Sequence, residues 1–205
     1  MSCNRPVLLL LLLELCVAGV LAQTQNRPTS PDAPTHGTAQ VFLTPSFVPR
    51  NLPDLVDRAD VIVDASVETV LSSRWTDPAR KSSLETDVLL SVVRVLKGPA
   101  TAKIIVSQSG GKLGDLYIEA PQDPLMVTAE RYILFLMNDG RTNLPTYSLP
   151  RIRRYVVTGI WNGRFYVHGD HVKVGSLATS TLKLYDDKPL GDFTNEIASA
   201  LSRKP

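Results

Sequence analysis

His168 and His171 have the spacing in this sequence that most favours metal chemistry. They flank Gly169-Asp170, a pair typical of two-residue turns, so the sequence predicts a hairpin that sets the two imidazoles opposite each other. Opposite residues on paired strands have Cβ atoms about 5 Å apart, and imidazole is a common ligand of transition metals. Two imidazoles and one turn carboxylate still make an incomplete set of ligands, so we expect no metal and no other cofactor.

A glycine-rich turn followed by a lysine, Gly110-Gly111-Lys112, invites comparison with phosphate-binding loops. It lacks the Gly-x-x-x-x-Gly-Lys-Ser/Thr spacing of those loops, and no helix is predicted to follow it. A glycine-rich connection between strands fits these residues better.

Hydrolysis needs a nucleophile beside a general base, and no such pair stands out. The sequence contains neither Gly-x-Ser-x-Gly nor His-Glu-x-x-His, and one of its three histidines, His36, lies in a polar N-terminal segment. Glu68 and Asp87 could act as paired carboxylates, but both occupy polar positions of alternating strands, where solvated charges are usual.

The two tryptophans, Trp75 and Trp161, could mark a contact surface or close one end of the core. No residue is predicted to be catalytic. The candidate binding residues are Gly110, Gly111, Lys112, Trp161, His168 and His171.

Residues 1–22 have the three parts of a cleavable signal peptide. Arg5 gives a positive start, an apolar stretch follows, and Val20-Leu21-Ala22 offers the small residues that a signal peptidase requires. The apolar stretch contains Glu14 and is shorter than the about 20 residues of a membrane-spanning helix. We predict cleavage after Ala22 and a secreted or periplasmic protein with no stable membrane insertion. Retention of the segment as an anchor is the alternative.

Both cysteines, Cys3 and Cys16, fall within the predicted signal peptide, so the mature chain would have no disulfide and no thiolate ligand. With no Asn-X-Ser/Thr sequon either, the composition favours a bacterial exported protein. The net charge is only +2, and aromatic residues make up 6% of the chain. Nucleic-acid binding is therefore not expected, despite the basic cluster Arg151, Arg153 and Arg154.

The chain divides into a tether and one domain. Residues 23–46 are rich in Pro, Thr, Gln and Ser, which predicts a flexible tether, and residues 47–205 are expected to form a single β-barrel domain. A short helix is expected over residues 51–58, because Asn51 suits an N-cap and Pro53 suits the first turn.

The middle of the chain has the patterns of strands. Strict alternation over residues 59–71 predicts a strand with one buried face. Over residues 86–96 the apolar phase slips by one residue between Val92 and Val93, which predicts a β-bulge. Shorter strands are expected at 103–107 and 116–118. The run 132–137 is apolar throughout, which indicates a strand buried on both faces.

The C-terminal part suggests a meander and a helix. Asn162-Gly163 separates the apolar runs 155–161 and 164–168 and predicts a type I′ hairpin, to which residues 171–174 would add a third strand. Apolar residues at helical spacing predict a helix over residues 192–201. Together the elements predict a mainly β fold, a small OB-like barrel with a short N-terminal helix and a C-terminal helix. A β-sandwich is the alternative.

Three segments, 59–63, 92–98 and 130–136, come in an order and spacing that resembles the netrin-like, metalloprotease-inhibitor-like OB barrels. A set of uncharacterised exported bacterial domains is more similar still, because they add a Gly-Gly-x-x-Gly loop like Gly110–Gly114. The resemblance implies the fold. It does not imply the inhibitor mechanism, which uses an N-terminal cysteine, and Ala129 replaces a glycine that is usual in the turn before 130–136.

These observations favour an exported, non-enzymatic binding or accessory module whose partner is another envelope or extracellular protein. The alternative is a secreted hydrolase that uses carboxylates or a metal near His168 and His171. The sequence leaves the oligomeric state open.

Overall fold

The computed structural model of this protein describes residues 36–141 and 152–203. The predicted signal peptide and tether residues 23–35 lie outside the described residues. No helix in the described part is long and apolar enough to cross a membrane. In chain order the elements are β1 (His36–Gln40), α1 (Leu52–Arg58), β2 (Val61–Trp75), β3 (Leu84–Lys97), β4 (Lys103–Ser109), β5 (Gly111–Leu113), β6 (Asp115–Glu119), β7 (Arg131–Asn138), β8 (Arg154–Val157), the 3₁₀ helix η1 (Ile160–Gly163), β9 (Arg164–His168), β10 (His171–Val174), the 3₁₀ helix η2 (Lys183–Tyr185), β11 (Lys188–Pro189) and α2 (Leu190–Ser202).

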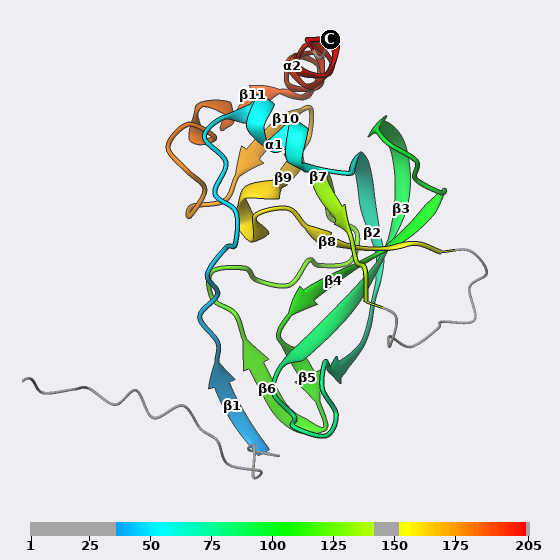
Figure 1. The fold of residues 1–205 in the computed structure, drawn as a ribbon, viewed down its shortest axis with the longest axis vertical. Coiled ribbons are helices and arrows are strands. Elements are labelled where there is room, and N and C mark those ends of the chain that lie inside the picture. Colours follow the sequence, from blue (N-terminus) through cyan, green and yellow to red (C-terminus); the bar gives the residue numbers. More distant parts are fainter. Residues whose placement is uncertain (1–35, 142–151, 204–205) are drawn as a thin grey trace, which may run out of the picture. The chain divides into compact units, whose positions relative to one another are not determined.

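Five strands close into a barrel (Figure 1). β2 pairs with β3 and β3 with β4, all antiparallel, while β4 pairs with β8 in parallel. β8 then pairs with β7, and β7 returns to β2. The predicted mainly β barrel with two helices is confirmed, and this closure excludes the alternative of a β-sandwich.

Further strands extend from the barrel. β9, β10 and β11 continue the sheet outward from β7, and β5 and β6 form a hairpin whose free side pairs in parallel with β1. β1 belongs to the segment that the sequence predicts to be a flexible tether. Its residues 36–40 are instead paired with β6, so this part of the segment belongs to the folded domain. The residue that follows β1 also stays close to β6, because the Val41 amide donates to the Glu119 carbonyl.

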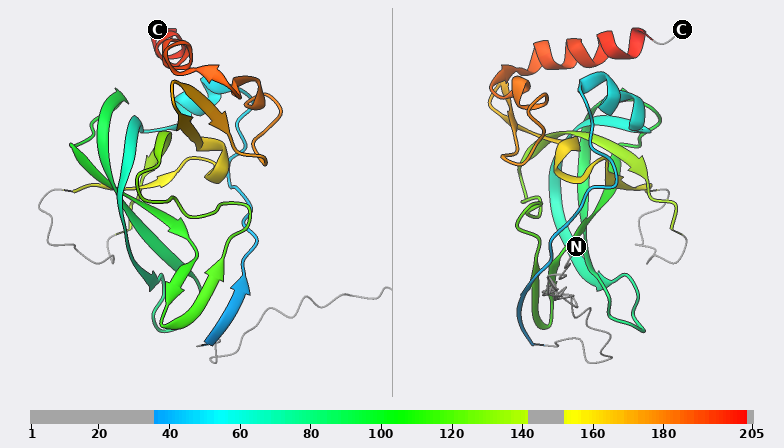
Figure 2. Two further views of the ribbon diagram at one scale, coloured as in Figure 1. Left: turned by 180° about the vertical axis from the view of Figure 1, so that it is seen from behind. Right: turned by 60° about the vertical axis from the view of Figure 1, so that its left-hand side comes forward.

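Two apolar cores lie on opposite sides of β2 and β7. One core fills the barrel and includes Val63, Leu134 and Tyr155. The other contains Ile133 and Phe135 from the outer face of β7, packed against α1, β9, β10 and α2. Two views show α1 and α2 side by side at the end of the barrel away from β5 and β6 (Figures 1 and 2). The prediction that residues 132–137 are buried on both faces is therefore confirmed over Tyr132–Leu136.

The predicted bulge and helices are also confirmed. The β2–β3 register shifts between Asp64 and Ala65, where Val93 is the extra residue on β3. Asn51 caps α1 by accepting a hydrogen bond from the Asp54 amide. At the other end of α1, the Lys97 ammonium donates to the carbonyls of the last turn, including that of Val56, which satisfies acceptors that a helix end leaves open.

The predicted Asn162-Gly163 hairpin is wrong. Both residues lie in η1, and the strands on either side, β8 and β9, pair with β7 and not with each other. The left-handed residues are Gly159 and Ile160, with φ 64° and 57°, and the turn therefore begins before Asn162. Asn162 is buried and donates to the Gly159 carbonyl, so its amide stabilises the 3₁₀ turn from inside.

Ala129 occupies a left-handed position, with φ 72°, in the exposed turn before β7. An alanine there is strained because its Cβ approaches the following carbonyl. The turn forms all the same, because the Ala129 amide donates to the Val67 carbonyl of β2.

We expect Ala129→Gly to raise the free energy of unfolding by about 0.5–1 kcal/mol, the relief of strain less the larger entropy of the unfolded chain. Urea unfolding followed by circular dichroism measures it. Ala102→Gly, in an exposed loop whose φ is not positive, is the control and should give no gain. Equal or opposite effects of the two changes would show that Ala129 is not strained.

Candidate functional site

The six predicted binding residues do not form one site. Gly110, Gly111 and Lys112 lie at the start of the β5–β6 hairpin, Trp161 lies in η1, and His168 and His171 lie at the tip of the β9–β10 hairpin. They therefore belong to three separate parts of the fold.

The glycine-rich turn serves the packing of the hairpin. Gly111 has φ 129°, and a Cβ there would lie 1.9 Å from Oγ1 of Thr86 and 2.3 Å from Oγ of Ser73. Thr86 donates to the Gly110 carbonyl and the Lys112 amide donates to Ser73, so both hydroxyls are used by the turn itself. Lys112 is exposed, and no helix begins at this turn. The turn has the geometry of a tight strand connection.

The two histidines are opposite each other, as the sequence predicts, because His168 pairs with His171 in the β9–β10 register. Nδ1 of His171 lies 2.7 Å from Oδ1 of Asp170, whose side chain is exposed. Among residues 36–141 and 152–203, no three His, Cys, Asp or Glu side chains gather in the way a metal site requires.

Glu68 and Asp87, the carboxylates that could have formed a catalytic pair, have separate partners. Glu68 is exposed and contacts Lys103 and Ser91, and the hydrogen bond from Lys103 lowers the pKa of its carboxyl. Asp87 is fully buried on the outer face of β3. Each carboxylate is thus held by basic and hydroxyl partners of its own.

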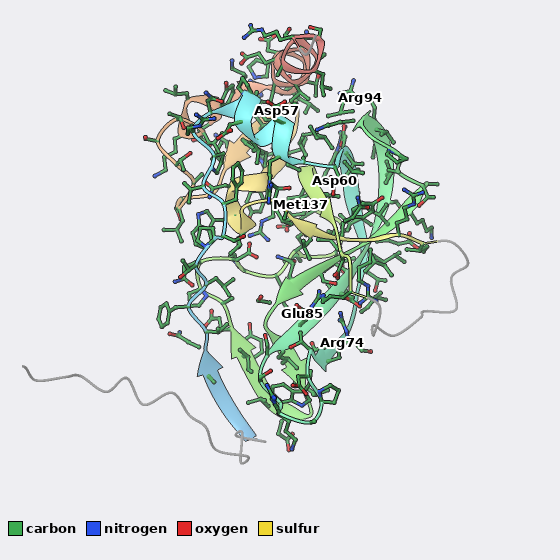
Figure 3. All side chains as sticks on the ribbon, viewed as in Figure 1. Asp57, Asp60, Arg74, Glu85, Arg94 and Met137 are labelled. Carbon is green, nitrogen blue, oxygen red and sulfur yellow. The ribbon has the colours of Figure 1, made fainter. Side chains whose placement is uncertain are left out.

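Asp87 is the centre of a buried ion-pair network. Nη1 of Arg74 lies 2.8 Å from Oδ1 of Asp87, and Nη2 of Arg154 lies 3.0 Å from Oδ2. The Ser107 hydroxyl donates to Oδ1 over 2.6 Å. Arg74 also contacts Glu85, its neighbour on β3 (Figure 3). Of the basic cluster noted in the sequence, Arg154 is therefore turned toward Asp87, and Arg151 lies outside the described residues.

Trp161 does line a pocket. The pocket has a volume of about 120 Å³ and lies between η1, the loop after β6 and the loop after β10. Its aromatic walls are the half-buried rings of Trp161 and Tyr166, and Leu177 is 49% exposed at its edge. Pro121, Pro124 and Arg164 also line it.

Arg164 fixes one wall of this pocket. It is the first residue of β9, which pairs with β7. Because side chains alternate along a strand, Arg164 and Tyr166 lie on the same face of β9. Nη1 of Arg164 donates to the Pro124 carbonyl over 2.7 Å, and Nη2 lies 3.0 Å from Oδ1 of Asp123. The guanidinium also lies 5.4 Å from the centre of the Tyr166 ring. Arg164 thereby joins the loop after β6 to β9.

The charge of Arg164 is balanced within the protein. Asp123 and Arg164 are both buried, with side chains 6% and 3% exposed. Burial raises the pKa of the Asp123 carboxyl, and the nearby Arg164 guanidinium opposes that rise. Arg164, the charged residue in the lining of the pocket, is therefore paired within the protein.

Asn162 fixes the other wall. Its side chain is buried, donates to the Gly159 carbonyl and accepts a hydrogen bond from the Thr179 amide over 3.1 Å. The first contact holds η1, which carries Trp161, and the second holds the loop after β10, which carries Leu177. One amide group therefore positions both sides of the pocket opening.

A second, more open hollow of about 550 Å³ lies between β3 and the start of α2. The ion pair of Asp64 and Arg131 forms part of its lining, and Nε and Nη2 of Arg131 each donate to Asp64 over 2.7 Å. Strict alternation over residues 59–71 would put Asp64 on the exposed face of its strand, but the residue is 1% exposed. Sequence alternation gave no sign of this pair, nor of Asp123 beside Arg164, because both join residues far apart in the chain.

Removing the Asp87 carboxylate should destabilise the fold. We expect Asp87→Ala to lower the free energy of unfolding by about 3–5 kcal/mol, because two guanidinium groups would lose their buried partner. Glu68→Ala is the matched control, since its ion pair is exposed and contributes little. Urea unfolding of both variants tests this. Similar midpoints for the two would contradict a structural role for Asp87.

No protein-family model matches this chain, and no curated protein is significantly similar to it. The likeness to netrin-like barrels therefore stays a prediction from the sequence, and the barrel itself is what the structure establishes. The Trp161 pocket and the larger hollow between β3 and α2 are both candidate binding sites among the described residues.

Proposed function

We propose that this protein is an exported, non-enzymatic binding module that holds a partner protein through the Trp161 pocket. The partner would be another envelope or extracellular protein, as the signal peptide predicted for residues 1–22 implies. The observation that carries the proposal is a small aromatic pocket whose two walls are fixed by the buried residues Arg164 and Asn162.

The size of the pocket favours a protein partner. Pockets for small molecules and cofactors usually measure about 300–1,000 Å³, whereas this one measures about 120 Å³. A space of that size can take a single side chain. Protein interfaces often depend on one such anchor, buried in a pocket and surrounded by weaker contacts. Trp161 at the wall and Leu177 at the edge are residues of the kind that such an anchor contacts.

The buried acidic groups support binding rather than catalysis. Asp64, Asp87 and Asp123 are each ion-paired to arginine. An acid–base catalyst needs a group that can exchange a proton with a substrate. A carboxylate tied to arginine inside the protein instead stabilises the positions of the strands and loops around it.

We also infer that the barrel is of the OB type. Round the barrel, the strands follow in the order first, second, third, fifth, fourth, and the third and fifth are parallel. That order supports an OB-like Greek-key barrel. An OB barrel does not imply a particular function, because OB barrels have many different functions.

A capture experiment tests the proposed function. The mature chain carrying a photo-crosslinker next to the pocket is incubated with the extracellular and envelope fractions of its own organism. We expect a discrete crosslinked protein that Trp161→Ala loses by about tenfold or more, since truncation of a central anchor costs at least about 2 kcal/mol. Trp75→Ala, at the end of β2 and outside the pocket, should retain it.

Circular dichroism must show both variants folded. Capture that survives Trp161→Ala would overturn the role of the pocket. Turnover of a hydrolase substrate by the purified chain, abolished by changing His168 or His171, would instead favour the secreted hydrolase.

A further inference from the structure

We propose that the larger hollow, between β3 and the start of α2, binds a carboxylate joined to an aliphatic group. Such a ligand is either a small aliphatic acid or the C-terminus of a peptide. The hollow is separate from the Trp161 pocket, so this binding goes beyond the function proposed above. Its volume of about 550 Å³ lies within the range of about 300–1,000 Å³ that is usual for small-ligand sites.

A β-bulge brings two successive residues of β3 to this hollow. Val93 is the extra residue where the β2–β3 register shifts, and both Val93 and Arg94 line the hollow. Successive side chains of a regular strand point to opposite faces, whereas a bulge re-aims a side chain and is frequent beside functional sites. The bulge therefore sets an apolar and a cationic side chain together near the end of β3, where Figure 3 labels Arg94.

The charges of the hollow leave one guanidinium free. Arg94 is opposite Asp64 in the β2–β3 register, and Arg131 shares that face of the sheet. Nε and Nη2 of Arg131 both donate to Asp64, so that carboxylate already has its partner. Arg94 has no hydrogen bond or ion pair with any of residues 36–141 and 152–203. The three side chains thus sum to a single positive charge, which one carboxylate would balance.

The remaining charged residue of the lining favours a singly charged ligand. Asp170 is 91% exposed, and its Oδ1 lies 2.7 Å from Nδ1 of His171. Its negative charge would oppose a multiply charged anion such as phosphate more than a carboxylate. Arginine also matches a carboxylate in shape, because its planar fork can donate two parallel hydrogen bonds.

The apolar residues of the lining would cover the aliphatic part of the ligand. They are Val93, Pro189 and Leu190. Val93 is 58% exposed, and covering it would be favourable because apolar surface would leave water. Since Val93 and Arg94 are adjacent, one ligand would contact the first through its aliphatic group and the second through its carboxylate.

An NMR titration of the mature chain, residues 23–205, with hexanoate tests the site. We expect a Kd of about 1 mM or lower and shifts of the Val93, Leu190 and Gly191 signals. Hexanamide, which lacks the charge, and inorganic phosphate should each bind at least about tenfold more weakly. N-acetyl-glycyl-leucine, which has a free C-terminal carboxylate, is the second probe, and the tighter binder identifies the source of the carboxylate.

Three variants separate charge from shape. Arg94→Gln should weaken hexanoate binding about tenfold or more, because it removes the free positive charge. Arg80→Gln is the matched control and should bind as the unchanged chain does, since Arg80 is 85% exposed in the loop 76–83, outside the hollow. Val93→Thr keeps the β-branched shape and should weaken binding about twofold to fourfold, the contribution of about one methyl group. Circular dichroism checks that all three are folded.

Binding that is indifferent to Arg94→Gln, or phosphate binding as tight as that of hexanoate, would overturn this proposal. So would the absence of binding by both carboxylates at about 10 mM, or shifts confined to the Trp161 pocket. The proposed function fails separately. Partner capture that depends on Trp161, with no carboxylate binding, would leave that function standing and reject this site, while carboxylate binding without capture would do the reverse.

Discussion

The structure depends on β7 being buried on both faces. Tyr132, Leu134 and Leu136 point into the barrel, while Ile133 and Phe135 point toward the helices. A strand in this position has neighbours on both edges as well, β2 on one side and β8 and β9 on the other. Displacing it would open the barrel and detach the helical layer together, so the two cores are expected to be lost in one cooperative step.

The same strand sets the geometry of the pocket. Because β9 pairs with β7, its residues alternate between the two cores in the way that those of β7 do. Phe165 enters the helical core, and Arg164 and Tyr166 take the other face. β8 and β9 pair with successive stretches of the same edge of β7 and run in the same direction, so residues 158–163 leave that edge and rejoin it, and η1 carries Trp161 in this insertion. The pocket is therefore a consequence of how two strands share a third.

Much of the fold could be predicted because it depends on local patterns in the sequence. Alternation identified β2, a slip of phase identified the bulge at Val93, and a continuous apolar run identified β7. The hairpin prediction at Asn162-Gly163 was wrong because dipeptide preference cannot register that β7 competes for both neighbouring strands. The ion pairs of Asp64 and Asp123 were beyond reach for a similar reason, since their partners are distant in sequence.

The candidate site, too, could be predicted only where it depends on local sequence. Trp161 could be singled out as a large ring near a turn, but its pocket needs Arg164 and Asn162, which look in the sequence like an ordinary strand residue and an ordinary turn residue. Both have buried side chains whose hydrogen bonds go to loop backbone. Their polar groups are thus used to hold the walls, while the rings of Trp161 and Tyr166 remain part of the lining. In the binding function that we propose, a pocket built in this way would distinguish partners by shape and by the cost of desolvating charge.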